Sequence, residues 1–360
     1  MIIKTFYDII VIYYGGDNMK NNYFGNLYFI IHFIIEVTSF YIVTTYTNNP
    51  VFIFLALTYD FFAFIPQGIF GYFKDIGLKI NFAIVGMILS SMALVLLYFN
   101  IKPLLVVFIL ALGNSLIHIE GAETTIKSSK GKMAPSAIFV AGGSFGLITG
   151  KLLAMNNVPV LIILFINLLM IIPILLCNKK KDLINENNLS NYNFCNININ
   201  YKLIIILAVF VVAIRAFIGY GIPTSWNKTV LQTILLYCFM GIGKGMGGLL
   251  IDKIGIRKTA FISTIGALPF LLFGDRIMMI SLIGIMLFSM TMAITLGLIV
   301  SVLKKYPGVA FGFTTLGLFI GSFPLFIFKI DSFILNCIII SSFTIVCMLI
   351  LNIVCRKEKI

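Results

Sequence analysis

The sequence is poor in charge: only 11% of its 360 residues are charged, whereas 60% are apolar. Its mean hydropathy is correspondingly high, at +1.07. A water-soluble domain of this length needs many more charged and polar side chains to cover its surface. This shortage excludes a soluble enzyme or a soluble binding module, and it indicates a chain that lies largely in a membrane.

Cysteine and histidine are also scarce, with six cysteines and two histidines in the whole chain. The cysteines stand singly, and neither histidine has a second histidine at the spacing of a metal site. Neither a disulfide framework nor a structural zinc site is indicated, so we expect no cofactor and no bound metal. The cysteines are Cys177, Cys195, Cys238, Cys337, Cys347 and Cys355.

Long apolar runs fill most of the chain. Crossing about 30 Å of hydrocarbon takes roughly 20 apolar residues per helix, and these runs are too long and too uniform for the strands of a barrel. We therefore predict an all-α membrane protein with twelve spans. The spans lie near residues 24–46, 51–71, 80–99, 103–122, 134–154, 157–177, 203–222, 229–250, 259–274, 277–303, 309–328 and 332–354.

A polar segment rich in asparagine and lysine divides these spans into six and six. Its composition predicts a flexible cytoplasmic linker. The predicted parts are a tail at 1–23, an N-terminal half at 24–177, the linker at 178–202, a C-terminal half at 203–355 and a tail at 356–360. Met19 is an alternative start to Met1, because Gly15 to Asn18 can be encoded by a sequence that resembles a ribosome-binding site.

Basic residues predict the orientation in the membrane, because cytoplasmic loops carry an excess of lysine and arginine. With the N-terminus inside, eighteen basic residues fall on the cytoplasmic side and five on the other. We therefore expect an inner-membrane protein with both termini in the cytoplasm, and the net charge of +13 faces anionic lipid rather than nucleic acid. The five outer residues are Lys102, Lys151, Lys228, Arg276 and Lys329.

One loop motif occurs after the eighth span and, in degraded form, after the second. GGLLIDKIGIRK fits G-x-L-x-D-[RK]-x-G-x-[RK]-[RK], the loop motif of major facilitator transporters, and GYFKDIGLK is a shortened copy. An Asp in such a loop can accept hydrogen bonds from the N-terminal amides of a neighbouring helix. The motif residues are Gly248, Asp252, Lys253, Gly255, Arg257 and Lys258, with Gly71, Asp75 and Gly77 in the first copy.

Glycines recur at intervals of four in the fifth and eleventh spans. Gly142, Gly146 and Gly150 share one helix face, and Gly317 and Gly321 repeat that spacing in the second half. Small residues at this interval let helices approach closely. We expect these glycines to pack helices together, and a helix that slides during transport could use the same smooth face.

Several ionisable residues fall inside predicted spans, where each costs several kcal/mol unless it is paired or hydrated. We expect them to form a polar centre that carries protons and substrate, the alternative being hydrogen bonds that only hold helices together. Glu123 is expected to be a solvated helix-end residue, and Lys244 a partner for acids of the loop motif. The candidates for the pathway are His32, Glu36, Asp60, His118, Glu120 and Arg215.

Three segments resemble the fosmidomycin-resistance branch of major facilitator efflux proteins. They are HFIIE from His32, GNSLIHIEGAE from Gly113 and AIFVAGGSFGLITGKLL from Ala137, and IRAFIGY around Arg215 is similar to a stretch that carries a lysine there. The resemblance implies the major facilitator fold with 12 transmembrane helices in two six-helix halves. It also implies proton-coupled export, as an antiporter, of a small drug-like or anionic compound.

These observations predict a monomeric secondary transporter that works by alternating access on a small-molecule substrate and protons, and that is not an enzyme. An importer or exchanger of an anionic metabolite remains open, because residues do not give the direction of coupling. A membrane metalloenzyme is a further alternative from another class. Its ligands would be His32, Glu36, His118, Glu120 and Glu123.

Overall fold

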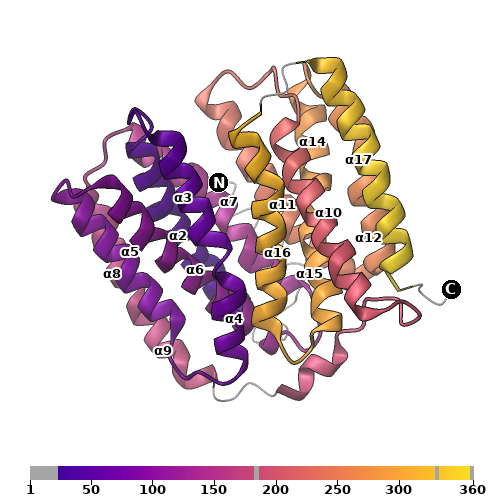
Figure 1. The fold of residues 1–360 in the computed structure, drawn as a ribbon, viewed down its shortest axis with the longest axis horizontal. Helices are drawn as coiled ribbons and strands as arrows, with labels where there is room; N and C mark the ends of the chain where they lie inside the picture. Colours follow the sequence, from indigo (N-terminus) through magenta and orange to yellow (C-terminus); the bar gives the residue numbers. More distant parts are fainter. Residues whose placement is uncertain (1–22, 182–185, 329–331, 357–360) are drawn as a thin grey trace.

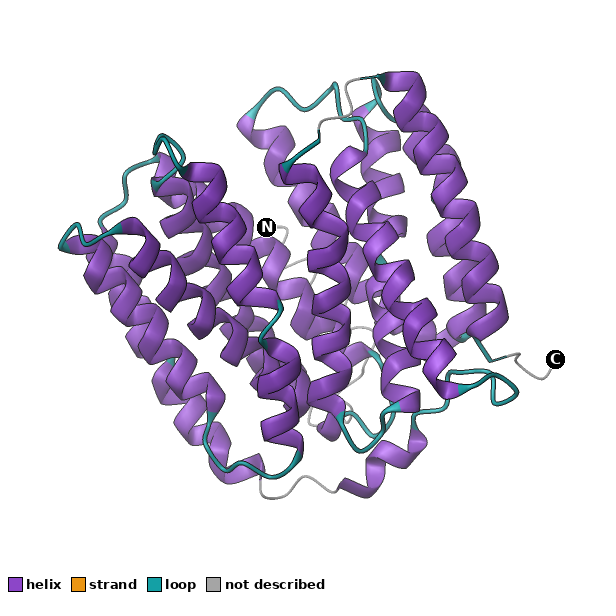
Figure 2. Cartoon of the chain, in the orientation of Figure 1, coloured by secondary structure: helices purple, strands orange, loops and turns teal. Residues whose placement is uncertain are grey.

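The computed structural model describes residues 23–181, 186–328 and 332–356. The predicted N-terminal tail, with both candidate starts, and most of the predicted C-terminal tail lie outside this range. The described residues form helices joined by short loops, with one isolated backbone bridge and no strand among them (Figure 2). The all-helical prediction is confirmed.

The N-terminal half contains eight helical segments. They are α2 (Tyr23–Thr45), α3 (Phe52–Phe64), α4 (Gln67–Asp75), α5 (Phe82–Tyr98), α6 (Pro103–Ser128), α7 (Ala134–Met155), α8 (Val160–Leu169) and α9 (Ile171–Lys181).

The linker and the C-terminal half contain the remaining segments. They are the 3-10 helix η2 (Glu186–Asn191), α10 (Tyr201–Gly221), α11 (Val230–Ile254), α12 (Ile256–Phe261), the π-helical turn η3 (Ile262–Gly266), α13 (Leu268–Phe273), α14 (Met278–Ser289), α15 (Thr291–Val302), α16 (Pro307–Ser322), the 3-10 turn η4 (Phe323–Phe326) and α17 (Phe333–Val354).

Eleven helical stretches among the described residues are long and apolar enough to cross a membrane, and α5 is a shorter apolar helix of 17 residues. Some predicted spans consist of two segments. The second predicted span, for example, consists of α3 followed by α4, with Pro66 directly before α4. Proline has no amide hydrogen to donate within a helix, so a break there is expected.

The two halves stand side by side in Figure 1, with α2 to α9 in indigo to magenta and α10 to α17 in red to yellow. Within the halves, α2 packs closely on α7 and α10 on α16. Between the halves, α7 packs on α11 and α4 on α16. We call the end of the molecule that carries Asp75, Asp252 and the linker the linker end, because the halves are joined there.

The predicted packing glycines lie at the two close helix pairs. A Cβ atom added to any of them would collide with a neighbouring backbone, for example at 2.9 Å from the carbonyl oxygen of Val209 in the case of Gly317. The collisions for Gly142, Gly146 and Gly150 are with α2, and those for Gly317 and Gly321 are with α10. Backbone packing of this kind needs residues without a side chain.

The linker is fixed to both halves from Tyr192 onward, rather than being the flexible tether that its composition predicts. The buried Tyr192 hydroxyl donates to the carbonyl oxygens of Ile126 and Lys132, each at 3.2 Å, in the N-terminal half. The amide of Phe194 donates to Ser301 Oγ in the C-terminal half at 3.0 Å. Two aromatic residues in a polar segment therefore provide anchors that its average composition conceals.

Candidate functional site

The loop motif of the second half joins the two halves through Asp252. Its two carboxylate oxygens accept hydrogen bonds from the amides of Met133 and Ala134, at 2.8 Å and 3.0 Å. These amides stand at the start of α7, where a helix has unsatisfied donors and a partial positive charge. The contact is the one that the sequence predicts for an Asp in this loop.

The shortened copy makes the equivalent contact in the first half. Asp75 accepts from the amides of Gly308 and Val309, at 3.0 Å and 2.8 Å, at the start of α16. Both acceptor residues end or nearly end a helix in one half, and both donor pairs begin a helix in the other. The two contacts together hold the linker end closed.

Each copy of the motif has a glycine in a left-handed backbone conformation. The φ angle is +96° at Gly77 and +89° at Gly255. Residues with a Cβ rarely adopt this region, so these glycines let the chain turn directly after α4 and α11.

Basic residues of the two copies have different partners. Arg257 donates to Asn352 Oδ1 on α17, with its Nε atom at 2.9 Å. The first copy lacks the basic residue after Asp75, but Lys74 precedes that aspartate and its Nζ atom lies 3.0 Å from Glu120 Oε2. Lys74 thus binds α4 to α6 within the N-terminal half.

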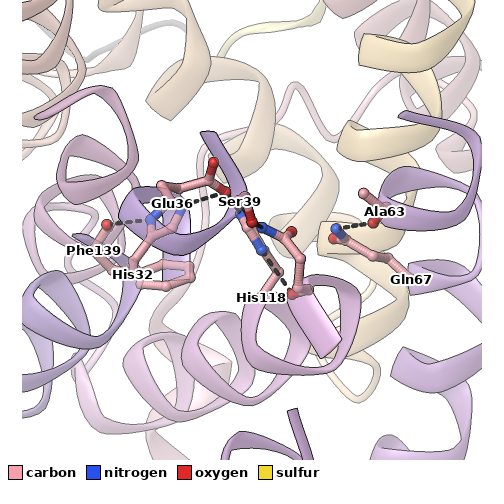
Figure 3. A network of polar contacts seen from close by, with 8 residues as sticks. His32, Glu36, Ser39, Ala63, Gln67, His118 and Phe139 are labelled. Carbon is pink, nitrogen blue, oxygen red and sulfur yellow. Dashed lines mark hydrogen bonds and ion pairs between the residues drawn. The ribbon is translucent and has the colours of Figure 1, made fainter. Parts of the chain in front are cut away.

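Two histidines and one carboxylate meet in the interior of the N-terminal half. Glu36 Oε1 lies 3.7 Å from His32 Nε2 on the same helix and 3.6 Å from His118 Nε2 on α6. Figure 3 shows the three side chains directed toward one another. All three residues are buried, and we call them the His–Glu–His cluster.

Backbone carbonyls orient both histidine rings. His32 Nδ1 lies 2.8 Å from the carbonyl oxygen of Phe139, and His118 Nδ1 lies 2.9 Å from that of Asn114. A carbonyl only accepts, so each Nδ1 must carry a hydrogen. If the rings are neutral, each Nε2 atom has a lone pair that faces the Glu36 carboxylate oxygen, and these acceptors repel one another. A proton shared between them, or another cation, would make the arrangement favourable.

Neighbouring residues that the sequence analysis did not single out complete the cluster. Asn114 Nδ2 donates to Glu36 Oε1 at 2.8 Å and lies 3.1 Å from Ser39 Oγ. Gln67, also drawn in Figure 3, lies apart from the cluster and donates to the carbonyl oxygen of Ala63 at 2.7 Å. The signal available in the sequence was their position: polar amides inside apolar spans, on the same helices as the charged candidates.

Glu120 and Glu123 do not belong to this cluster. Glu120 Oε2 accepts from the amide of Phe82 at 2.8 Å and is paired with Lys74 as described above. Glu123 Oε1 lies 2.9 Å from Lys127 Nζ on the same helix. Both carboxylates are buried near the linker end, so Glu123 is not the solvated residue that we expected.

Asp60 lies on α3 and is partly exposed. Its carboxylate makes no hydrogen bond or ion pair to the part of the chain that the structure describes. Asp60 is therefore not part of the cluster.

Arg215 on α10 is a buried cation without a carboxylate partner among the described residues. Its Nη1 atom lies 3.7 Å from Met292 Sδ, its Cζ atom lies 5.6 Å from the centre of the Phe288 ring, and its Nε atom has no hydrogen-bond partner. Neither Glu36 nor Asp60 pairs with it.

Lys244 on α11 is a second cation without a carboxylate partner among the described residues, and it is partly buried. It lines a small cavity between the halves, together with Val140, Met292 and Phe311. It makes no ion pair with any described acid, and Asp252 on the same helix is bound to backbone amides. The expected role of Lys244 as a partner for the loop acids is therefore not seen.

Aromatic rings connect the cavity to the His–Glu–His cluster. The Phe311 ring centre, which belongs to the cavity wall, lies 6.3 Å from that of His118 and 6.0 Å from that of Phe139. Phe139 in turn lies 4.8 Å from the His32 ring. One region at the interface of the halves is thus bordered by the His–Glu–His cluster, which can hold a proton, and by Arg215 and Lys244, which have no carboxylate partner among the described residues.

The His–Glu–His cluster is also the one group of described residues with the donor set of a metal site. Its three ligand atoms lie within 4.8 Å of one another. Two imidazole nitrogens and one carboxylate suit a transition metal, and carbonyl hydrogen bonds to the far ring nitrogens are typical around such ions. Glu120 and Glu123, which the metalloenzyme alternative requires, are engaged with lysines.

Comparisons with known proteins give structural likeness only. No protein-family model matches the sequence, and no curated protein matches it either. The human organic anion transporter shares the fold with a TM-score of 0.60 and 12% identity over 91% of this chain and 99% of that one. The E. coli fucose:proton symporter has a TM-score of 0.56 and 14% identity over 91% of this chain and 97% of that one.

A bacterial homologue of the iron transporter ferroportin, solved in an outward-facing state, gives a TM-score of 0.55 and 12% identity over 91% of this chain and 98% of that one. These proteins match nearly from end to end. At such low identities the likeness concerns the fold alone. A proton:xylose symporter described as a member of the major facilitator superfamily matches with a TM-score of 0.58 and 11% identity over 91% of this chain and 95% of that one, so the chain has the major facilitator fold.

Proposed function

We propose that the protein is a proton-coupled secondary transporter that exports a small anionic or drug-like compound by alternating access. The observation that carries the proposal is the buried guanidinium of Arg215, which has no carboxylate partner among the described residues. Arginine does not lose its charge at any physiological pH, so burial without an anion is costly. An anionic substrate would supply the missing charge.

Lys244 on α11 supports the same conclusion. Two cations at one interface repel each other unless an anion lies between or near them. The cavity that Lys244 lines also contains Met292, whose sulfur contacts Arg215. The two cations therefore border the same region, where a carboxylate or phosphonate group would meet both.

The His–Glu–His cluster supports proton coupling. A proton shared by Glu36 with either histidine would relieve the contact between their lone pairs, and its loss would leave a negative charge near the substrate region. Protonation and anion binding could therefore influence each other across the interface. The fucose:proton symporter and the organic anion transporter with the same fold are named for protons and anions respectively.

The orientation forms part of the proposal. If the linker end is cytoplasmic, as the excess of lysine and arginine there predicts, both termini and the linker lie inside the cell, and the inner membrane surrounds the helices. Closure of the linker end then corresponds to an outward-facing state. We also propose that the halves 24–177 and 203–355 move as the two units of the cycle, and that one chain is the working unit.

A metal ion as cargo is the second candidate, because the His–Glu–His cluster has a suitable donor set. It leaves Arg215 and Lys244 unexplained, since cations beside the pathway oppose the passage of a cation. Elemental analysis of protein purified without a histidine tag distinguishes a metal cargo from an anionic substrate. Stoichiometric metal in the wild type that is absent from Glu36→Gln would favour the metal as cargo.

The main test is a thermal-shift screen of the purified protein against small anions and their neutral analogues. Compounds that raise the melting temperature are then tested in proteoliposomes for transport driven by a pH gradient. We expect an anion to stabilise the protein and to move against its gradient when protons flow. Stabilisation only by neutral compounds, or flux that ignores the pH gradient, would contradict the proposal.

A further inference from the structure

Two cysteines face each other where the linker meets the end of α17. Cys195 and Cys355 form the isolated antiparallel bridge of the structure. The hydrogen bonds that flank them run from the amide of Asn196 to the carbonyl of Val354 and from the amide of Arg356 to the carbonyl of Phe194, each 2.8 Å long. The cysteines themselves are thus the non-hydrogen-bonded pair of this short ladder.

Such a pair brings side chains closer than any other position in an antiparallel ladder. Its Cα atoms are about 4.5 Å apart, and disulfides are found at Cα separations of about 4.4–6.8 Å. The structure holds both residues as thiols, with Cys355 buried and Cys195 partly exposed. The other four cysteines lie within helices.

We propose that Cys195 and Cys355 form a reversible disulfide that fastens the linker to the end of α17 when the protein meets a disulfide oxidant such as oxidised glutathione. This inference concerns a site away from the substrate region and does not depend on the proposed transport function. At a cytoplasmic linker end, such a bond would be transient and responsive to redox conditions.

The reaction proceeds by two thiol–disulfide exchanges. The thiolate of the more exposed Cys195 attacks one sulfur of the oxidant, forms a mixed disulfide and releases one glutathione thiolate. The thiolate of Cys355 then attacks the Cys195 sulfur, forms the protein disulfide and releases the second. The protein loses two thiol hydrogens as protons, which the two glutathione thiolates take up, and one disulfide is reduced for each one formed.

Partial burial raises the pKa of the Cys195 thiol. The thiolate that starts the reaction is therefore scarce at neutral pH, so the bond should form slowly there and faster in mildly alkaline buffer.

The position of the bond gives it a conformational consequence. Tyr192, anchored in the N-terminal half by its hydroxyl, precedes Cys195 by three residues, a span of at most about 11 Å when fully extended. Separation of the halves at the linker end must therefore break either the Tyr192 contacts or the attachments of the linker to the C-terminal half, which are the bridge at Cys195 and the hydrogen bond from Phe194 to Ser301. A disulfide removes the second route and favours the closed linker end.

The test uses the purified full chain, incubated with reduced or oxidised glutathione, alkylated and mapped by mass spectrometry without reduction. We expect a cross-linked peptide that contains Cys195 and Cys355 and disappears on reduction. Hydrogen–deuterium exchange in residues 186–200 should become at least about fivefold slower in the oxidised protein, the low end of typical coupling effects.

Variants make the result specific. Cys195→Ser, at the more exposed position, should abolish both the cross-link and the slower exchange. Cys337→Ser, at a partly buried position on α17, should preserve both. Separate alkylation of Cys195 and Cys355 after oxidation would overturn the proposal, as would a cross-link that leaves exchange in the linker unchanged.

Discussion

Asp75 and Asp252 occupy equivalent places in the two halves, and each accepts two backbone hydrogen bonds from the first amides of a helix in the opposite half. The two contacts differ in sequence context, because only the second lies in a complete loop motif. Their geometry nevertheless agrees closely, which indicates that the acid and the helix start are the essential parts. The following predictions begin with this pair.

Asp252→Asn should weaken the closed linker end. Asparagine keeps one acceptor oxygen but loses the charge and the second acceptor, and hydrogen bonds to a charged group contribute about 1.5–3 kcal/mol each. We expect faster hydrogen exchange at the start of α7 and a lower transport rate, with normal amounts of protein in the membrane. Asp275→Asn serves as a control, since Asp275 also accepts from a backbone amide, that of Ser225, but near the opposite end. Equal effects of the two variants would contradict this role.

Glu36→Gln should uncouple transport from the pH gradient while leaving substrate-induced stabilisation in place. The amide cannot take up a proton from either histidine, although it can still accept from Asn114. Proteoliposomes with and without a pH gradient measure the effect, and His118→Gln should behave similarly.

Glu120→Gln is the matched comparison for that experiment. Its carboxylate is paired with Lys74 and Phe82, so its loss should lower the melting temperature and preserve coupling. Coupling that survives in Glu36→Gln but fails in Glu120→Gln would restore the interpretation that the sequence alone suggested.

Arg215→Gln should abolish stabilisation and transport of anionic compounds, whereas Arg215→Lys should retain some transport with weaker affinity. Lysine keeps the charge but cannot bind an anion with two parallel N–H groups. The loss in affinity for the glutamine variant should be about tenfold or more, as expected for a charge-assisted hydrogen bond. Arg276→Gln, in a loop at the end opposite the linker end, should change neither stabilisation by anions nor their transport. Wild-type affinity in Arg215→Gln would instead indicate that Arg215 is a packing residue.

Gly146→Ala should lower the melting temperature although alanine favours helices. The added Cβ would collide with the α2 backbone at Phe33, and overpacking of this kind costs about 1–3 kcal/mol. Gly219→Ala in α10 has open space around the new atom and should be neutral or stabilising, by up to about 1 kcal/mol. Scanning fluorimetry of both variants measures whether the melting temperature falls or rises relative to the wild type. A rise in Gly146→Ala would show that α2 and α7 are more loosely packed than described.

A reporter that fluoresces only in the cytoplasm should be active when fused after Lys359. The excess of basic residues at the linker end is the physical reason, because positively charged loops are retained inside. A dark fusion, combined with activity of a periplasmic reporter at the same place, would reverse the proposed orientation.

The sequence predicted the fold class and the Asp252 contact because both follow from local patterns: the length of the apolar runs, and an acid near the end of a helix in a loop motif. It did not predict that His118 would join Glu36. His118 and Glu120 are two residues apart, which separates them by about 200° around a helix, so they face opposite sides of α6. Their adjacency in the sequence suggested one site, whereas the structure assigns His118 to Glu36 and Glu120 to Lys74.

The break between α3 and α4 could have been predicted from Pro66, but the environment of Lys244 could not. Whether a lysine near a loop motif pairs with its acid depends on the competition from backbone amides of a helix 119 residues away in sequence. The anchored linker is a similar case, since the partners of Tyr192 come from α6 and the turn after it.

The crossed contacts of Asp75 and Asp252 also bear on how the chain matures during synthesis. The amides of Met133 and Ala134 emerge from the ribosome long before Asp252, and Asp75 emerges long before Gly308. A nascent N-terminal half therefore has two helix-end donors without their acceptor and one carboxylate without its donors. Each half supplies what the other lacks, so the linker end can seal only after translation has passed α16, and a truncated chain would retain an open and hydrated linker end.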